Sequence, residues 1–248
     1  MGYTEQFDEI TVDRPLFYVM PNGVPTPLAL HIMVADQDTA LRNMAYLDAP
    51  PASVNGAPTF ANGYASFKSN TNFITLGMPD ANTCTTIFVV RNTDTLAGNA
   101  TTPSFYGTYE GSTTAGQHVY RSAADAGVGV ALATTDGSVY TGSLFSYADT
   151  PPGAAFQCYA RTIDDAAKVD RIQNLTQSLA ADSQSFAARN RGTQTRNMRF
   201  GSSYRAVLNG TSDGALIAHW NLVLSQPQID AFYIQFKAMY QARFGITI

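Results

Sequence analysis

Acidic residues are the first candidates for chemistry, because a glycosidase needs two carboxyl groups, one as acid and one as nucleophile or base. The chain has three glutamates, Glu5, Glu9 and Glu110. Glu9 and Asp13 have an i, i+4 spacing, which places two side chains on one face of a strand. They lie near the start of the chain, outside its strand-rich region, and Glu110 stands alone. We therefore expect no catalytic residue and a protein that is not an enzyme.

The histidines and aspartates do not form a recognisable metal site. His31, His118 and His219 are far apart and lack the short spacings of zinc ligands. His219, beside Trp220, is better explained as a half-buried residue of a sheet than as a base. The aspartates are too sparse for a calcium loop, and the Asp-Gly pairs at 136–137 and 213–214 indicate turns. We expect no metal and no cofactor.

Tyrosines in the middle third of the chain are the remaining candidates for ligand contact. They lie in or beside Gly/Ser/Thr-rich segments, where exposed rings can stack on sugars while hydroxyls and amides bind the sugar OH groups. The alternative for each tyrosine is that it simply lines the sheet. The predicted ligand-binding set, with a neighbouring glutamate and one turn aspartate, is Tyr106, Tyr109, Glu110, Tyr120, Asp136, Tyr140 and Tyr147.

Composition limits the class of protein. The net charge is −4 and 14% of the residues are charged, which argues against nucleic acid as a partner. No stretch is long and apolar enough to cross a bilayer, so we expect no membrane insertion. The first thirteen residues are acidic where a secretory signal is basic, and we expect no signal peptide. Cys84 and Cys158 are then expected to be free, buried thiols.

The last thirty residues predict an amphipathic helix. Ser225 and Gln228 form a capping box, Pro227 suits the first turn, and Gly245 suits the left-handed residue that ends a helix. Apolar residues recur at helical spacing between these ends. They are Ile229, Phe232, Tyr233, Phe236, Met239 and Tyr240.

From residue 59 the chain predicts a series of short strands separated by turn residues, as in a sandwich or barrel. An Asn-Gly pair at 62–63 predicts a hairpin, and the apolar run at 84–92 predicts a central strand covered on both faces. The expected strands occupy 59–67, 72–78, 84–92, 104–111, 117–123, 128–134, 138–148, 154–162, 167–176, 185–190 and 197–203, with an alternating segment at 215–222.

The first fifty residues differ from the rest. Two apolar runs, 16–20 and 28–34, flank a Pro/Asn/Gly turn, and a short helix is expected after Asp36 or Asp38. A Pro-rich joint follows. We expect residues 1–50 to form an N-terminal arm or small docking subdomain that contacts a partner or a neighbouring copy, and residues 51–248 to form the main domain.

Four segments resemble the concanavalin A-like lectin/glucanase jelly roll, particularly its laminin-G-like modules. They are "GAPTFANGYASFKSNTNFITLGM", "TCTTIFVVRNTDT", "GAAFQCYARTIDDAAKVDRIQNLTQS" and the ending "MRFGSSYRAVLNGTSDGALIAHWNLVLSQPQIDAFYIQFKAMYQARFGI". The resemblance rests on their order and spacing over about residues 57–248. It implies an all-β jelly-roll β-sandwich with a C-terminal amphipathic helix. Glycosidases of this scaffold carry an acidic pair on alternate strand positions, and the central strands here have Thr, Ile, Phe and Val instead.

Modules of this kind are frequent in bacteriophage tail and other virion proteins. The resemblance therefore implies a non-enzymatic virion protein, of a tail fibre, baseplate or tail tip, that contacts a host-surface receptor or glycan and assembles in the host cytoplasm. A purely structural decoration subunit is the first alternative, and a glycan-degrading enzyme is the second. We expect a homo-oligomer, with a trimer as the simplest guess, because open sheet edges need covering.

Overall fold

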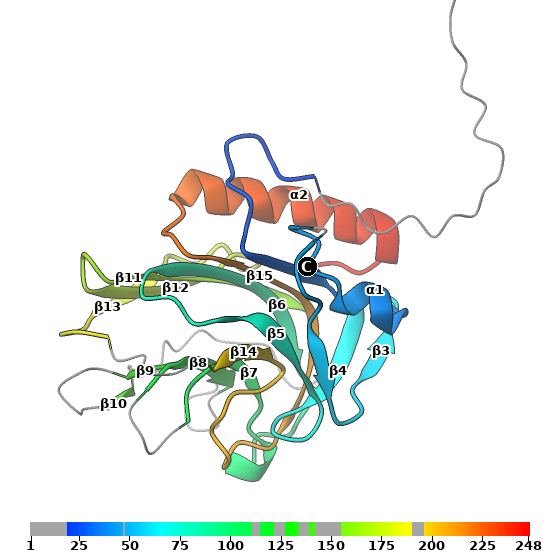
Figure 1. Ribbon diagram of the computed structural model, residues 1–248, viewed down its shortest axis with the longest axis horizontal. Coiled ribbons are helices and arrows are strands. Elements are labelled where there is room, and N and C mark those ends of the chain that lie inside the picture. Colours follow the sequence, from blue (N-terminus) through cyan, green and yellow to red (C-terminus); the bar gives the residue numbers. More distant parts are fainter. Residues whose placement is uncertain are drawn as a thin grey trace, which may run out of the picture.

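The computed structural model describes residues 19–46, 48–110, 115–121, 127–133, 139–141, 155–189 and 196–248. Two antiparallel sheets pack face to face, and helix α2 (Gln226–Phe244) lies over one of them (Figure 1). The predicted fold, a mostly β sandwich with a C-terminal helix, is confirmed. Neither α2 nor any other helix in the described ranges is long and apolar enough to cross a membrane.

The sheet under α2, called here the helix-bearing sheet, has the order β13-β12-β11-β6-β15-β4-β3, and β1 also pairs with β15. Its strands are β1 (Ala29–Ile32), β3 (Thr59–Ala61), β4 (Tyr64–Lys68), β6 (Cys84–Asn92), β11 (Gln157–Asp164), β12 (Val169–Asn174), β13 (Asp182–Ser185) and β15 (Thr211–Trp220). The predicted Asn-Gly hairpin joins β3 to β4. The predicted central strand is β6, which is buried along nearly its whole length between β11 and β15.

The second sheet, called here the opposite sheet, has the order β10-β9-β8-β7-β14-β5-β2. Its strands are β2 (Ser53–Asn55), β5 (Phe73–Pro79), β7 (Ser104–Gly107), β8 (Gln117–Arg121), β9 (Val128–Ala133), β10 (Val139–Thr141) and β14 (Asn197–Phe200). The strand expected at 185–190 is instead β13, which ends at Ser185. Most of the strand expected at 138–148 lies outside the described residues.

The core lies between the sheets and beneath the helix. Phe67 and Phe88 of the helix-bearing sheet meet Phe200 and Tyr106 of the opposite sheet, with ring centroids 5.2 and 4.9 Å apart. One end of this interior is polar: the side chains of Arg161 and Asp170 are each 1% exposed and form an ion pair at 2.6 Å. Cys84 and Cys158 are free and buried, as predicted.

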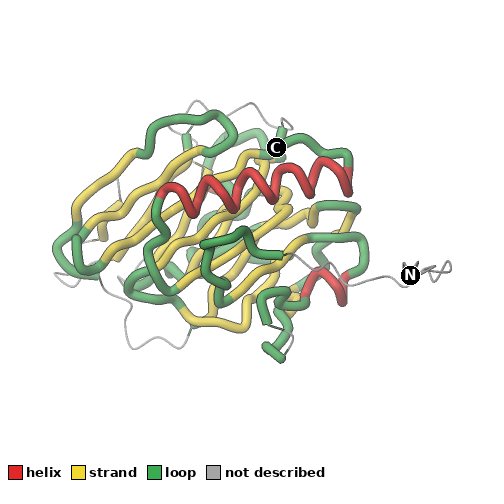
Figure 2. Tube along the Cα trace, turned by 90° about the horizontal axis from the view of Figure 1, so that it is seen from above, coloured by secondary structure: helices red, strands yellow, loops and turns green. Residues whose placement is uncertain are grey.

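Helix α2 forms where the sequence predicts it. The Gln228 Oε1 accepts the Ser225 N–H at 2.9 Å, and Gly245 has a φ of 67° at the end of the helix. Phe232 meets Trp220 of β15 edge to face, at 5.2 Å between ring centroids. Figure 2 shows α2 lying across the strands of the sheet that it covers. The apolar stripe of α2 therefore closes the sandwich on one side.

The expected N-terminal arm needs correction, because part of it belongs to the sandwich. β1 pairs with β15 from Ala29↔His219 to Ile32↔Leu216, where β4 does not reach. Leu30, Ile32 and Met33 are core residues with at most 1% exposure. The predicted short helix is α1 (Gln37–Leu41), capped by Asp36. The boundary at residue 51 does not separate two units in the described chain; residues 1–18 lie outside it.

Candidate functional site

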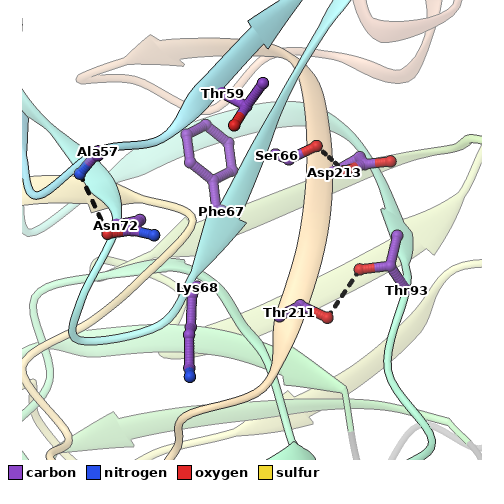
Figure 3. Close-up of a pocket in the computed structure, with 9 residues that line it drawn as sticks. All are labelled: Ala57, Thr59, Ser66, Phe67, Lys68, Asn72, Thr93, Thr211 and Asp213. Carbon is purple, nitrogen blue, oxygen red and sulfur yellow. Dashed lines mark hydrogen bonds between the residues drawn. The ribbon is translucent and has the colours of Figure 1, made fainter.

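A pocket of about 440 Å³ opens on the outer face of the helix-bearing sheet, beside the part covered by α2 (Figure 3). Strands β3, β4 and β15 and the segment after β6 build it. Most of its side chains are small and polar. Its lining residues are Ala57, Thr59, Ser66, Phe67, Lys68, Asn72, Thr93, Thr211 and Asp213.

Strand register places the polar residues of the pocket on one face. Ser66 pairs with Thr59 of β3 on one side and with Asp213 of β15 on the other, and Asp213 pairs with Arg91 of β6. This makes a row of four polar residues across four strands. A second row lies two residues away along each strand. Lys68 pairs with Thr211, and the Thr93 side chain lies next to that of Thr211. Because side chains alternate between faces, the two rows share a face and lie roughly 7 Å apart.

The inner face of the same strands explains why these residues point outward. Phe67, between Ser66 and Lys68, packs against Phe200 of the opposite sheet. A Cβ added to Gly214 would lie 2.5 Å from the Phe200 ring and 2.8 Å from the Phe67 ring. Gly214 is therefore required by a close approach of aromatic rings inside a strand. The turn predicted at 213–214 is wrong: both residues lie in β15, where a bulge separates Gly214 from Leu216.

Asp213 is fixed at the centre of the first row. Its Oδ1 accepts the Ser66 hydroxyl at 2.6 Å, and its Oδ2 lies 2.7 Å from Arg91 Nε and Nη2. The Arg91 guanidinium also stacks on the rings of Tyr64 and Phe156, at 5.0 and 4.6 Å from their centroids. The carboxylate is 6% exposed, so it is held in one position at the edge of the pocket.

The second row presents hydroxyls and a cation. The Thr93 hydroxyl donates to the Thr211 hydroxyl at 2.9 Å (Figure 3). The Thr211 hydroxyl donates in turn to Asp94 at 3.3 Å. The Lys68 ammonium forms no ion pair with any carboxylate in the described ranges, and the Thr59 hydroxyl has no hydrogen-bond partner there. These two groups remain available to a ligand that carries acceptor oxygens.

The pocket combines groups that suit hydroxyl-rich ligands. Lys68 and Thr59 can donate, the threonine hydroxyls can donate or accept, and Asp213 offers a fixed acceptor. A metal is not indicated: within the described ranges no three His, Cys, Asp or Glu side chains gather closely enough to hold an ion. The site therefore has the chemistry of polar recognition rather than of metal binding.

The residues predicted from the sequence lie elsewhere. Tyr106 is fully buried between the sheets beside Phe88, so it has no surface for a sugar, and for this residue the alternative of a core role holds. Tyr109 and Tyr120 each pack against His118 on the outer face of the opposite sheet, where Tyr109 is buried, and Glu110 pairs with Arg196. Tyr140 lies in β10, and its side chain is not among those described. Asp136 and Tyr147 lie outside the described residues.

Sequence reasoning missed the pocket residues because no local pattern marks them. Ser66 and Lys68 alternate with buried Ala65 and Phe67, which is a detectable strand signal. Their neighbours Thr211 and Asp213 are about 145 residues away along the chain, and only the register of the sheet brings them together.

Comparison with known proteins supports the fold. No protein-family model matches the sequence, and no curated protein matches it. Among solved structures, the chain is similar to the binding domain of botulinum neurotoxin serotype D, at 9% identity and a TM-score of 0.61. This likeness shows the fold, a β-sandwich of two antiparallel sheets. The receptor binding domains of botulinum neurotoxin D and of the C/D mosaic serotype give TM-scores of 0.60 and 0.59, at 9% and 8% identity.

These matches cover 90% of this chain but only 55% or 56% of the binding domains. The chain thus spans about half of their length. At such low identity the likeness shows the fold alone.

Proposed function

We propose that this lectin-like domain is a non-enzymatic binding module that recognises a sugar through the pocket of β3, β4 and β15. The single observation that carries the proposal is the Lys68 ammonium, which has no ion pair within the described ranges, beside threonine and serine hydroxyls and a fixed Asp213, all on one face. Sugar rings offer hydroxyl and carboxylate oxygens at spacings that two rows of polar side chains can bind. The similar solved structures are named as binding and receptor binding domains, which is in keeping with this role.

The non-enzymatic part of the proposal rests on Asp213. This carboxylate is the acidic residue among those lining the pocket, and its two oxygens are engaged by Ser66 and Arg91. A glycosidase needs a second carboxyl group at a defined distance and a free path from both to the sugar. Purified protein should release no reducing sugar from any polysaccharide that it binds. Release of reducing sugar, abolished by Asp213→Asn, would refute this part.

A glycan array followed by titration of its strongest hit tests the binding. Lys68→Met should weaken that interaction by roughly tenfold, as expected when a charge-assisted hydrogen bond is lost. Thr59→Val should weaken it less, because a neutral hydrogen bond is worth less. Lys237→Met is the matched control, since Lys237 lies on the exposed side of α2. Equal binding by the Lys68 and Lys237 variants, or no hit on the array, would contradict the proposal.

The biological setting is a further proposal drawn from the resemblance of the sequence. We propose a virion protein of a bacteriophage tail or baseplate that contacts a host-surface glycan. The competing proposal is a decoration or assembly subunit that binds only other virion proteins, for which the same array should show no binding. Mass spectrometry of purified particles would test the location, and light scattering would test the expected trimer against a monomer of 26.7 kDa.

A further inference from the structure

The outer face of the opposite sheet carries a second cluster, formed by arginines and aromatic rings. It is called here the arginine face, and it consists of Arg196, Arg199, Arg205, Phe73, Tyr120 and Tyr204. Met198 and Phe200 of β14 point into the core, so Arg199 between them points outward. In β8, Val119 points into the core and Tyr120 outward. The arginine face is thus on the side of the sandwich away from α2.

The guanidinium groups of this face lie over aromatic rings. The Arg199 Cζ lies 3.5 Å from the Tyr204 ring centroid and 4.5 Å from that of Phe73. Arg196 lies 5.0 Å from Tyr204, and Arg205 lies 5.9 Å from Tyr120. Stacking uses the face of a guanidinium and leaves the N–H groups at its edge for acceptors. The arginines are therefore positioned in advance for anionic oxygens.

Several of these N–H groups have no acceptor. Arg199 Nη1 donates to the Ser203 carbonyl at 2.8 Å, but its Nε is buried without a partner in the described chain. Arg196 Nη2 pairs with Glu110, while its Nη1 is also buried without a partner there. Arg205 forms no ion pair with a described carboxylate. These two atoms are buried, so a ligand would meet this face through the partly exposed parts of the Arg196, Arg199 and Arg205 side chains.

The local charge is opposite to that of the whole chain. Among the described residues of this face and its immediate neighbour Glu110, three arginines and one glutamate leave two positive charges, whereas the chain as a whole carries −4. His118, which lies between Tyr109 and Tyr120, adds no charge, since burial lowers its pKa well below the usual value. A positive area on an acidic protein selects anionic partners, and its small size suits a few charges rather than a long phosphate backbone.

We propose that the arginine face binds an acidic polysaccharide, with the guanidinium edges of Arg196, Arg199 and Arg205 contacting its carboxylate or sulfate groups. The aromatic rings hold the guanidinium groups in place, and the half-buried Tyr120 and Tyr204 offer apolar surface to the sugar rings. This site is separate from the pocket and does not depend on it.

The test compares three soluble polymers by calorimetry: dextran sulfate, polygalacturonate and uncharged dextran. The proposal predicts binding of at least one acidic polymer, none of dextran, and weaker binding at higher salt. Arg205→Gln should weaken it by roughly tenfold, as for a lost charge-assisted contact. Arg199→Gln provides a second variant. Arg243→Gln, at the exposed end of α2, and Lys68→Met should both leave it unchanged.

Three results would overturn the proposal. Binding of neither acidic polymer at millimolar sugar would do so, and so would an equal loss in the Arg205 and Arg243 variants. Equally tight binding of a single-stranded oligonucleotide would show a general polyanion site instead. A difference between dextran sulfate and polygalacturonate would identify which anionic group is preferred. Because Lys68→Met affects only the pocket, failure at one site remains distinguishable from failure at the other.

Discussion

The outer faces of the two sheets use the same alternation of side chains but present different chemistry. On the helix-bearing sheet, small hydroxyl residues surround one lysine and one fixed carboxylate in a pocket beside α2. On the opposite sheet, three arginines lie over aromatic rings. The first arrangement suits a ligand with many hydroxyls, and the second suits a ligand with negative charges. If both proposals hold, one β-sandwich carries two kinds of recognition on its two outer faces.

The largest predicted effect is a loss of folding stability when a strand of the helix-bearing sheet is removed. Deleting residues 1–46 removes β1 and the burial of Leu30, Ile32 and Met33, each worth about 1.5–3 kcal/mol. It also removes the Pro25 carbonyl that accepts the Trp220 indole N–H at 2.7 Å. The sum approaches the whole stability of a typical domain, so the truncated chain should lose its cooperative urea transition.

A chain that begins at residue 19 is the matched control for this deletion, because it keeps every contact described above. It should unfold at the same urea concentration as the full chain. If the chain lacking residues 1–46 were soluble and unfolded at that same concentration, the first fifty residues would be an independent arm after all.

Mild acid should weaken the fold through buried histidines. Burial lowers the pKa of His31 and of His219 from 6.5 to about 4, so the folded state excludes protons that the unfolded state binds. The contribution of these two histidines to the free energy of unfolding is greatest above pH 6.5 and falls as the pH drops towards 4. Each histidine should lower the free energy of unfolding by about 2 kcal/mol when the pH falls from 7 to 5.

Urea midpoints at pH 7 and pH 5 measure this loss. Both histidines belong to the helix-bearing sheet. Because they contribute about equally, His219→Gln should remove about half of the pH dependence that the two cause together. A midpoint that does not change between these pH values would show that the two imidazoles are not buried and neutral.

A smaller effect distinguishes the packing of the two faces. Phe232→Leu loses the edge-to-face contact with Trp220 beneath α2, and should cost about 1–2 kcal/mol. Tyr204→Leu on the arginine face loses a partly exposed cation–π stack, and should cost about 0.5–1 kcal/mol. Thermal unfolding of both variants tests the order. A greater loss for Tyr204→Leu would mean that the arginine face has a structural rather than a binding role.

The elements that the sequence predicts correctly are those with local causes. The ends of α2 follow from Ser225, Gln228 and Gly245, which act within one turn of the helix. β6 is recognisable because both of its faces are apolar. The role of Gly214 could not be predicted, since its reason is the approach of Phe67 and Phe200 from distant parts of the chain. The Asp-Gly pair at 213–214 therefore predicts a turn where the structure has a strand.

The same limit explains the candidate site. Aromatic residues near small polar ones predict a ligand face in the middle of the chain, and that prediction stays untested; Tyr109 and Tyr120 lie on two sides of His118, and Tyr120 belongs to the arginine face. The pocket depends on the register of β3, β4, β15 and β6, which no stretch of sequence encodes by itself. β1 was likewise separated from its partner β15 by almost two hundred residues.

The most direct test of the pocket is to map a bound sugar by amide chemical shifts. The ¹H–¹⁵N spectrum of the 26.7 kDa chain would be followed during titration with the strongest neutral hit of the glycan array. The account predicts that the largest shifts fall on Thr59, Ser66, Lys68, Thr211 and Asp213, and that Lys68→Met reduces them. Shifts confined to the arginine face, or spread over both sheets and unaffected by Lys68→Met, would contradict it.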